Sequence, residues 1–374
     1  MDEEKLEEFV ADEEPFRDET IKKEPTKEGK LKKRIWLAVF VVINAVVIFF
    51  TARAEFTREA PKAPREQMGF RALLFLLGGL LCLAVVLAAE TAKYMLMMKH
   101  LGEKVSFSVA FKTAALGRYY DCVTPSGAGG QPFQIWYLHS NGYSDGAAAA
   151  MPLSAFFTMQ FGFVTLCLVI FPFFSRATDT TGLKIAAYIG AVAYTVVPVM
   201  ILISAVKPVL AEKIVGFFIR VGAKLRLIKD KEATEQHARE AIRSFAVNLK
   251  KITKNRKLFI ELMALSIVYQ LAMMCMPYFA VRTFGGELEF FRSIAVSVFV
   301  YASVTIVPTP GNSGAAEGSF YILFSRLDTA GVFWAMLLWR VLCYYSFIVI
   351  GVAIYLTNAA EKLITKRKKH ANEA

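Results

Sequence analysis

The stretch that decides the fold reads RYYDCVTPSGAGGQPFQIWYL, from residue 118 to residue 138, and long apolar segments lie on both sides of it. Glycine and proline destabilise the interior of a helix. A helix that enters this stretch is therefore expected to be interrupted near the middle of the stretch. At membrane depth, non-helical backbone is tolerated only where protein or a water-filled cavity surrounds it, because lipid cannot satisfy its N–H and C=O groups. If the flanking segments are in lipid, the glycines predict an internal cavity.

The composition indicates a membrane protein. Of the 374 residues, 55% are hydrophobic and only 20% are charged, and the mean hydropathy is +0.43. A soluble domain of this length usually carries more charge and fewer apolar residues. Long segments with no charged residue or a single one predict six full membrane spans. These spans are residues 35–52, 72–89, 147–174, 185–206, 258–281 and 330–357.

The basic residues predict the topology. They gather just before the first span, in residues 207–257 and in the tail 358–374, so the positive-inside rule places both termini in the cytoplasm. Residues 207–257 hold fourteen Lys or Arg and five acidic residues, and include an amphipathic segment expected to lie on anionic lipid headgroups. This distribution explains the net charge of +12 without a nucleic-acid partner. Residues 1–34 are expected to be a disordered, charged cytoplasmic tail.

Six spans satisfy this topology only if residues 105–141 and 293–325 each enter and leave the membrane on the same side. We predict two re-entrant broken-helix hairpins, the first opening to the cytoplasm and the second outward. Their sequences correspond, with TPSGAGGQPFQIWYL starting at Thr124 and TPGNSGAAEGSFYIL at Thr309. Such paired interruptions are typical of transporters built from inverted repeats, whose substrate sites lie near the midplane. The alternative is an exposed turn between two short crossings, which would give eight spans.

The turn of the first hairpin is a candidate anion site. Gly127, Gly129 and Gly130 let the backbone approach a ligand closely. Free N–H groups at the start of a helix near Gln131 favour an anion such as phosphate. The same glycines are also explained by tight packing of the hairpin against a neighbouring helix.

Two charged residues in the second half are candidates for headgroup binding. Glu317 stands at the start of the second half-helix, where a costly carboxylate at membrane depth suggests a counter-charge for an ammonium group or a proton carrier. The alternative is that it stabilises the helix dipole. Arg340 lies inside the last span with Tyr344 one turn further on, and is expected to bind a lipid phosphate or to pair with Glu317.

Other charged residues near the membrane are expected to be structural. Arg118 and Asp121 are three residues apart and share a helix face, so we expect them to pair with each other. Glu90, Glu261 and Lys112 lie near predicted membrane ends, where a long side chain can reach the headgroups. We assign no function to these residues.

The sequence offers little support for an enzyme. GNSG, residues 311–314, matches the G-x-S-G of rhomboid intramembrane proteases, but the only histidine after Ser313 is His370 in the basic tail, so a base for the serine is missing. The phosphate-binding pattern G-x-x-x-x-G-K-[ST] does not occur. The five cysteines lie singly, which predicts neither a zinc site nor disulfides. We therefore expect no metal and no cofactor.

Three motifs together resemble a known family. TPSGAGGQPFQIWYL, VPTPGNSGAAEGSF and WRVLCYY are similar to the membrane domain of lysylphosphatidylglycerol synthase, or flippase-like, proteins, over most of residues 35–357. The resemblance implies an all-α integral membrane protein that moves lipid. One departure is Gln134, where many members carry a basic residue. With the adjoining turn residues, the predicted headgroup-binding set is Pro125, Ser126, Gly127, Gly129, Gly130, Gln131, Gln134, Pro310, Gly311, Asn312, Gly314, Glu317, Arg340 and Tyr344.

The resemblance also bears on the reaction. Two-domain members follow the membrane part with a soluble domain that transfers lysine from lysyl-tRNA to phosphatidylglycerol, whereas only seventeen residues follow Thr357 here. We therefore expect movement of a phospholipid, with aminoacyl-phosphatidylglycerol among the candidates, across a bacterial cytoplasmic membrane. The alternatives are a membrane-embedded lipid-modifying transferase and a lipid-binding scaffold without transport. A second copy of the chain or a separate lipid-modifying enzyme is a candidate partner.

Overall fold

The structure is a computed structural model, and it describes residues 69–124, 127, 129–174, 255–304, 307, 309–327 and 330–358, residues 49 and 53, and short pieces between 185 and 254. The described elements are helices joined by turns, as expected for an all-α membrane protein. Their bounds are α3 Phe70–His100, α4 Phe107–Val123, α5 Gly130–Ser140, α6 Asp145–Phe174, α10 Arg256–Thr283, α11 Phe290–Val304, α12 Ala315–Ser325, α13 Val332–Arg340 and the π-helix η2 Val341–Tyr345.

Four helices are long and apolar enough to cross a membrane. They are α3, α6, α10 and the continuous helix Val332–Asn358 that contains α13 and η2. They overlap the predicted spans 72–89, 147–174, 258–281 and 330–357, but α3 continues beyond the predicted end at residue 89 to His100. The predicted span 35–52 lies almost entirely outside the described residues, as do the two charged tails. The predicted span 185–206 and the segment 207–257 are described only in pieces.

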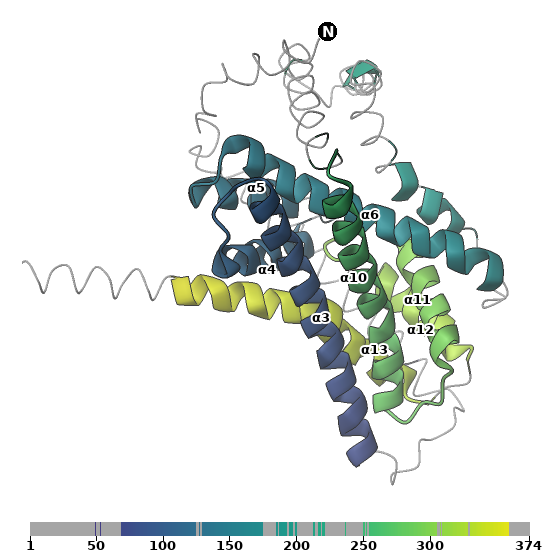
Figure 1. Cartoon of the computed structure of the whole chain (residues 1–374). Helices are drawn as coiled ribbons and strands as arrows, with labels where there is room; N and C mark the ends of the chain where they lie inside the picture. The colour runs from purple at the N-terminus through teal and green to yellow at the C-terminus, as the bar shows by residue number, and fades with distance from the viewer. Residues whose placement is uncertain are drawn as a thin grey trace, which may run out of the picture.

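The centre of the fold is the pair α3 and α10, which pack along much of their length, with α6 across both (Figure 1). Glycine makes the close approach possible, because a Cβ at Gly78 of α3 would lie 2.4 Å from Phe279 Cε1 of α10. On α6, a Cβ at Gly162 would be in ordinary van der Waals contact with the backbone of Ser266, at 3.5 Å, so a residue as small as alanine would also fit this crossing. Small residues at such crossings are how membrane helices bring their backbones together.

Two helical hairpins flank this pair, α4–α5 on one side and α11–α12 on the other (Figure 1). The second helix of each hairpin has 11 residues. Eleven residues rise roughly 16 Å, about half of the ~30 Å hydrocarbon core, so neither helix crosses a bilayer by itself. The side of the membrane to which each hairpin opens stays a prediction.

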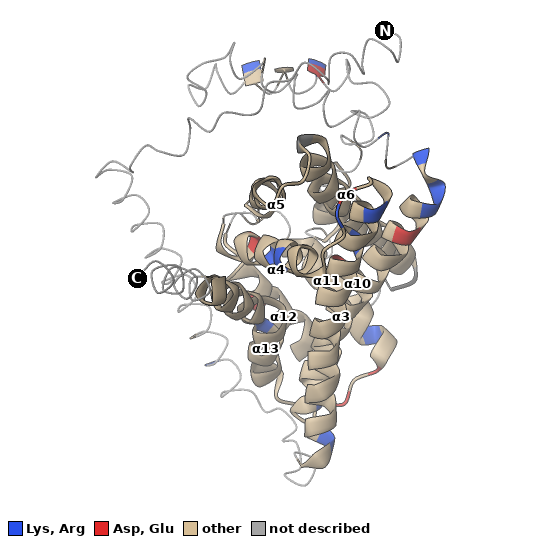
Figure 2. Ribbon diagram, turned by 60° about the vertical axis from the view of Figure 1, so that its left-hand side comes forward, with Lys and Arg blue, Asp and Glu red and all other residues tan. Residues whose placement is uncertain are grey.

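The first half of α3 presents an apolar surface, on which Leu73, Leu74, Leu77 and Leu81 are all at least half exposed. In Figure 2 the long helices are free of charged residues over much of their length, and many of the charges lie near their ends. An exposed leucine face of this kind suits contact with lipid.

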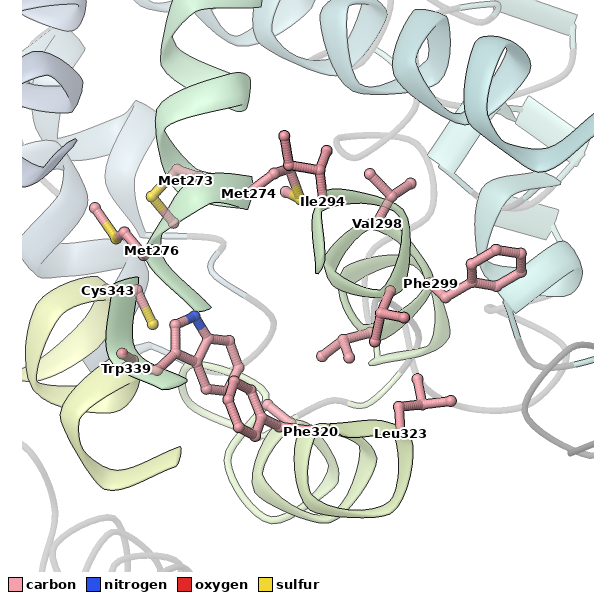
Figure 3. Close-up of a cluster of buried hydrophobic side chains, with 14 of the residues drawn as sticks. Met273, Met274, Met276, Ile294, Val298, Phe299, Phe320, Leu323, Trp339 and Cys343 are labelled. Carbon is pink, nitrogen blue, oxygen red and sulfur yellow. The ribbon is translucent and has the colours of Figure 1, made fainter. Parts of the chain in front are cut away.

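A buried apolar cluster joins the second hairpin to the last helix (Figure 3). The Trp339 ring stacks on Phe320 of α12, with ring centroids 4.8 Å apart, and Phe320 stacks in turn on Phe324. Residues of α10 and α11 close the cluster around them, including Met273, Met274, Met276, Ile294, Val298 and Phe299. This packing fixes α12 relative to the helix that carries Arg340.

Candidate functional site

In the turn of the first hairpin, side-chain oxygen atoms of the protein accept the backbone N–H groups that could bind an anion. The Gly129 N–H donates to Thr124 Oγ1 at 2.9 Å, and the Gly130 N–H donates to Asp121 Oδ1 at 3.1 Å. Gly127 has a φ of +63°, which favours glycine. An anion at the start of α5 would therefore have to replace these acceptors at Gly129 and Gly130.

In the turn of the second hairpin, a side-chain oxygen likewise accepts a backbone N–H at the start of the helix. Glu317 Oε2 accepts the Gly314 N–H at 2.6 Å, so the carboxylate caps the start of its own helix. The left-handed backbone at Gly311, Asn312 and Gly314, with φ of +58°, +53° and +90°, explains the residue types in this turn. Glu317 is buried, with 4% of its surface exposed.

Arg340 joins the last helix to this turn. Its Nε lies 2.6 Å from Glu317 Oε1, and its Nη1 donates to the Gly311 carbonyl at 3.2 Å. The pairing with Glu317 that the sequence suggested is therefore present. Arg340 is 4% exposed, and its Nη2 is buried without a hydrogen-bond partner among the described residues. A guanidinium with an unused donor is a candidate for binding a phosphate oxygen.

Tyr344 contacts both hairpins from the π-helical segment of the last helix. Its hydroxyl donates to the Cys122 carbonyl at the end of α4, at 3.2 Å. A Cβ at Gly311 in the second turn would lie 2.0 Å from Tyr344 Cε2. Single π-helical turns are rare and frequent at functional sites. Here the π turn carries the residue at which the two hairpins meet.

A cavity of about 540 Å³ lies between the two hairpins and the long helices. Of the predicted set, Gly127, Gln131, Gly311, Asn312, Arg340 and Tyr344 line it. Both hairpins therefore face one cavity, as the broken-helix interpretation requires. Its volume falls in the range typical of small-molecule sites.

Several predicted residues lie outside this wall. Gln134 is buried, and its Nε2 donates to the Thr113 carbonyl at 3.2 Å, which packs α5 against α4. The described part of the wall also lacks Gly129, Gly130, Pro310, Gly314 and Glu317. Pro125 and Ser126 lie outside the described residues.

Sequence reasoning missed several polar residues of the interior. Arg118 and Asp121 pair as expected, with Nη1 and Oδ2 3.4 Å apart, but both also line the cavity. Gln160, Tyr269 and Gln270 add polar groups from α6 and α10. Their place on long apolar helices gave no sequence signal, whereas the three-residue spacing of Arg118 and Asp121 did.

Lys93 was also missed, and the expectation for Glu90 was wrong. Glu90 does not reach the headgroups but is 7% exposed, and its Oε2 lies 2.7 Å from Nζ of the fully buried Lys93. Lys93 Nζ also lies 3.4 Å from Ser266 Oγ. The ring of Tyr269 lies close to both this pair and Arg118, with Lys93 Nζ 5.7 Å and Arg118 Cζ 6.0 Å from its centroid. The three-residue spacing of Glu90 and Lys93 was the signal.

No group of three His, Cys, Asp or Glu side chains suited to a metal ion occurs among the residues that the structure describes. Ser313 of the GNSG stretch is 2% exposed. The charged groups described in the interior are therefore the three ion pairs, Glu90–Lys93, Arg118–Asp121 and Glu317–Arg340.

The fold and the cavity define a class, that of multi-pass helical membrane proteins with a polar site between two interrupted helices. Residues 35–351 match the family described as the lysylphosphatidylglycerol synthase TM region, and the chain belongs to this family. A curated relative is a UPF0104 membrane protein of Archaeoglobus fulgidus, 23% identical over 258 residues. The match covers 68% of this chain and 78% of the relative.

Proposed function

We propose that this protein moves a phospholipid headgroup across a membrane through the cavity between its two hairpins. The observation that carries the proposal is that both hairpin turns and Arg340 line one cavity, and that Arg340 Nη2 has no hydrogen-bond partner among the described residues. Guanidinium groups bind phosphate oxygens with charge-assisted hydrogen bonds. The phosphate of a phospholipid is the anion that a membrane supplies in quantity.

The size of the cavity favours a headgroup over a whole lipid. A volume of about 540 Å³ holds a small polar molecule, and the acyl chains would stay in the bilayer. Apolar side chains of α6 and α10, including Phe163 and Met273, line the same space beside the polar groups. A wall of this mixed kind suits the junction of a headgroup with its glycerol and acyl chains.

The link that Tyr344 of the last helix makes to both hairpins is consistent with alternating access. Tyr344 touches the second turn at Gly311 and donates to Cys122 at the end of the first hairpin's leading helix. If the hairpins open to opposite sides, as the charge distribution predicts, the cavity lies between two entrances. We place the protein in the cytoplasmic membrane of a bacterium with both termini in the cytoplasm, and we expect aminoacyl-phosphatidylglycerol among its candidate lipids.

The test is flipping of phospholipids labelled on an acyl chain, in proteoliposomes, read by chemical quenching of the outer leaflet. Arg340→Lys keeps the charge but loses the planar fork, so flipping should fall about tenfold or more. The matched control is Arg282→Lys, because Arg282 lies at the end of α10, over the Phe75 ring and away from the described cavity wall. This variant should flip lipid at the wild-type rate.

Other outcomes separate the alternatives. Folded wild-type protein that flips lipid no faster than empty liposomes contradicts the proposal. Mass spectrometry of the recovered lipids then distinguishes the alternatives, since a chemically altered headgroup supports a transferase and an unaltered one supports a scaffold. A separate lipid-modifying enzyme or a second copy of the chain is a partner to add in that assay.

A further inference from the structure

The two carboxylate–arginine pairs of the hairpins differ in whether the carboxylate can still bind a ligand. In the pair of the second hairpin, Glu317 and Arg340 are 2.6 Å apart and each side chain is 5% exposed. The other carboxylate oxygen of Glu317 is bonded to Gly314, and Glu317 is outside the described cavity wall. This carboxylate is closed to a ligand.

The pair of the first hairpin is looser and faces the cavity. Asp121 and Arg118 are 3.4 Å apart, their side chains are 16% and 22% exposed, and both line the cavity. Asp121 has a contact to Gly130 on one oxygen and to Arg118 on the other, and an ionised carboxylate can accept about four hydrogen bonds. Asp121 therefore has unused acceptor capacity and lines the cavity, although the sequence alone suggested Glu317 for this role.

Arg118, which pairs with this carboxylate, and Arg340, which lines the same cavity, each have a donor without a partner among the described residues. Both residues line the cavity, and the unpartnered atoms, Arg118 Nε and Arg340 Nη2, lie buried in its wall. The cavity wall therefore offers one open carboxylate and two guanidinium groups. It can receive a cation and a phosphate at the same time.

Charge balance decides between ligands. The three ion pairs described in and beside the cavity, Glu90 with Lys93, Asp121 with Arg118 and Glu317 with Arg340, are each neutral. A charge brought into a buried site is costly unless it is compensated. A net anionic or net cationic headgroup would leave one charge uncompensated, whereas a headgroup with one phosphate and one amine would leave none.

We propose that the cavity selects a net-neutral phospholipid headgroup, in which a single ammonium group binds Asp121 and the phosphate binds Arg118 and Arg340. The inference rests on the proposed function in one respect, that a phospholipid headgroup enters this cavity. It names the kind of headgroup, and it makes Asp121 the residue that recognises the amine.

The first experiment measures binding of short-chain lipids to the purified protein in detergent by isothermal titration calorimetry. The probes are phosphatidylethanolamine, its N-acetylated form, phosphatidylglycerol and lysyl-phosphatidylglycerol, which has two amines for one phosphate. Phosphatidylethanolamine should bind about tenfold more tightly than each of the others. Tighter binding of phosphatidylglycerol or of the lysyl lipid overturns the inference.

Two variants assign the selectivity to Asp121. Asp121→Asn should weaken binding of phosphatidylethanolamine about tenfold and leave that of its N-acetylated form unchanged. Asp121→Glu keeps the charge and should keep the preference. An equal loss for all lipids in Asp121→Asn would mean a structural role only. If Asp121→Asn does not fold, the wild-type comparison of phosphatidylethanolamine with its N-acetylated form still decides.

A flipping assay with the same headgroups separates the two proposals. Selective binding without flipping contradicts the proposal that the protein transports lipid, but it supports the proposal that the cavity selects a net-neutral headgroup. Flipping without a headgroup preference supports transport but contradicts the proposed selection of a net-neutral headgroup. Folded protein that binds none of these lipids contradicts both.

Discussion

The ring of Tyr344 lies against the backbone of Gly311 with no room for a side chain between them. A Cβ on Gly311 would be 2.0 Å from Tyr344 Cε2, and the φ of Gly311 is +58°. The hydroxyl of the same tyrosine reaches the Cys122 carbonyl at 3.2 Å. One residue of the last helix therefore holds the turn of the second hairpin and the end of α4 in fixed relation.

Gly311→Ala should lower the free energy of unfolding by roughly 2–5 kcal/mol, because a left-handed alanine and a displaced tyrosine ring are both unfavourable. Thermal unfolding in detergent measures the change. Gly318→Ala is the matched control, since nothing lies within 4 Å of a Cβ there. It should be neutral or stabilising by up to about 1 kcal/mol. Equal melting temperatures for Gly311→Ala and the wild type would contradict the described turn.

Tyr344→Phe keeps the ring against Gly311 and removes the hydrogen bond to Cys122. It should cost about 0.5–1.5 kcal/mol of stability, the usual contribution of one hydrogen bond. Under the transport proposal it should also slow flipping, because the last helix, which contacts the second turn, loses its hydrogen bond to the first hairpin. Tyr345→Phe, at the neighbouring position with 43% exposure, is the control and should melt like the wild type. A loss no greater than that of the control would count against the link.

Lys93→Met should be strongly destabilising, by about 3–5 kcal/mol, because it leaves the buried Glu90 carboxylate without its cation. The double variant Glu90→Gln with Lys93→Met removes both charges and should recover at least half of the loss. Chemical or thermal unfolding of the two variants gives the comparison. A double variant less stable than Lys93→Met alone would show that the pair is not the reason for the loss.

Gly117→Ala should destabilise the first hairpin by roughly 1–3 kcal/mol, because the new Cβ would lie 1.9 Å from Gln134 Nε2. Gln134→Ala alone loses the bond to Thr113 and leaves a void. The double variant should be more stable than the sum of the two single losses predicts, by about 1 kcal/mol or more. Strictly additive losses would indicate that the two residues are not in contact.

The fold class and four of the predicted spans followed from the sequence because long uncharged segments have few alternatives to a membrane helix. The interruption of each hairpin was equally visible, since Gly and Pro act locally on the backbone. The predicted pairing of Arg118 with Asp121 also holds, because residues three apart on a helix meet whatever surrounds them.

The sequence did not indicate which of the acidic side chains lines the cavity and which is closed off by partners. Glu317 and Asp121 are both acids beside a broken helix, and only packing shows that Glu317 is closed off by Arg340 and Gly314 while Asp121 faces the cavity. The burial of Lys93 was not predictable for the same reason, although its three-residue spacing from Glu90 indicated the ion pair. Its burial depends on α6 and α10, which are more than fifty residues away along the chain.

The pairing of the buried charges has a consequence for energy supply. Moving one elementary charge across a membrane potential involves about 2.3 kcal/mol per 100 mV. An ion pair that moves as a unit displaces no net charge, and the three pairs described here are each of this kind. Rearrangement of the hairpins with these pairs intact would therefore draw no work from the transmembrane voltage, and a neutral headgroup travelling with them would leave it equally untouched.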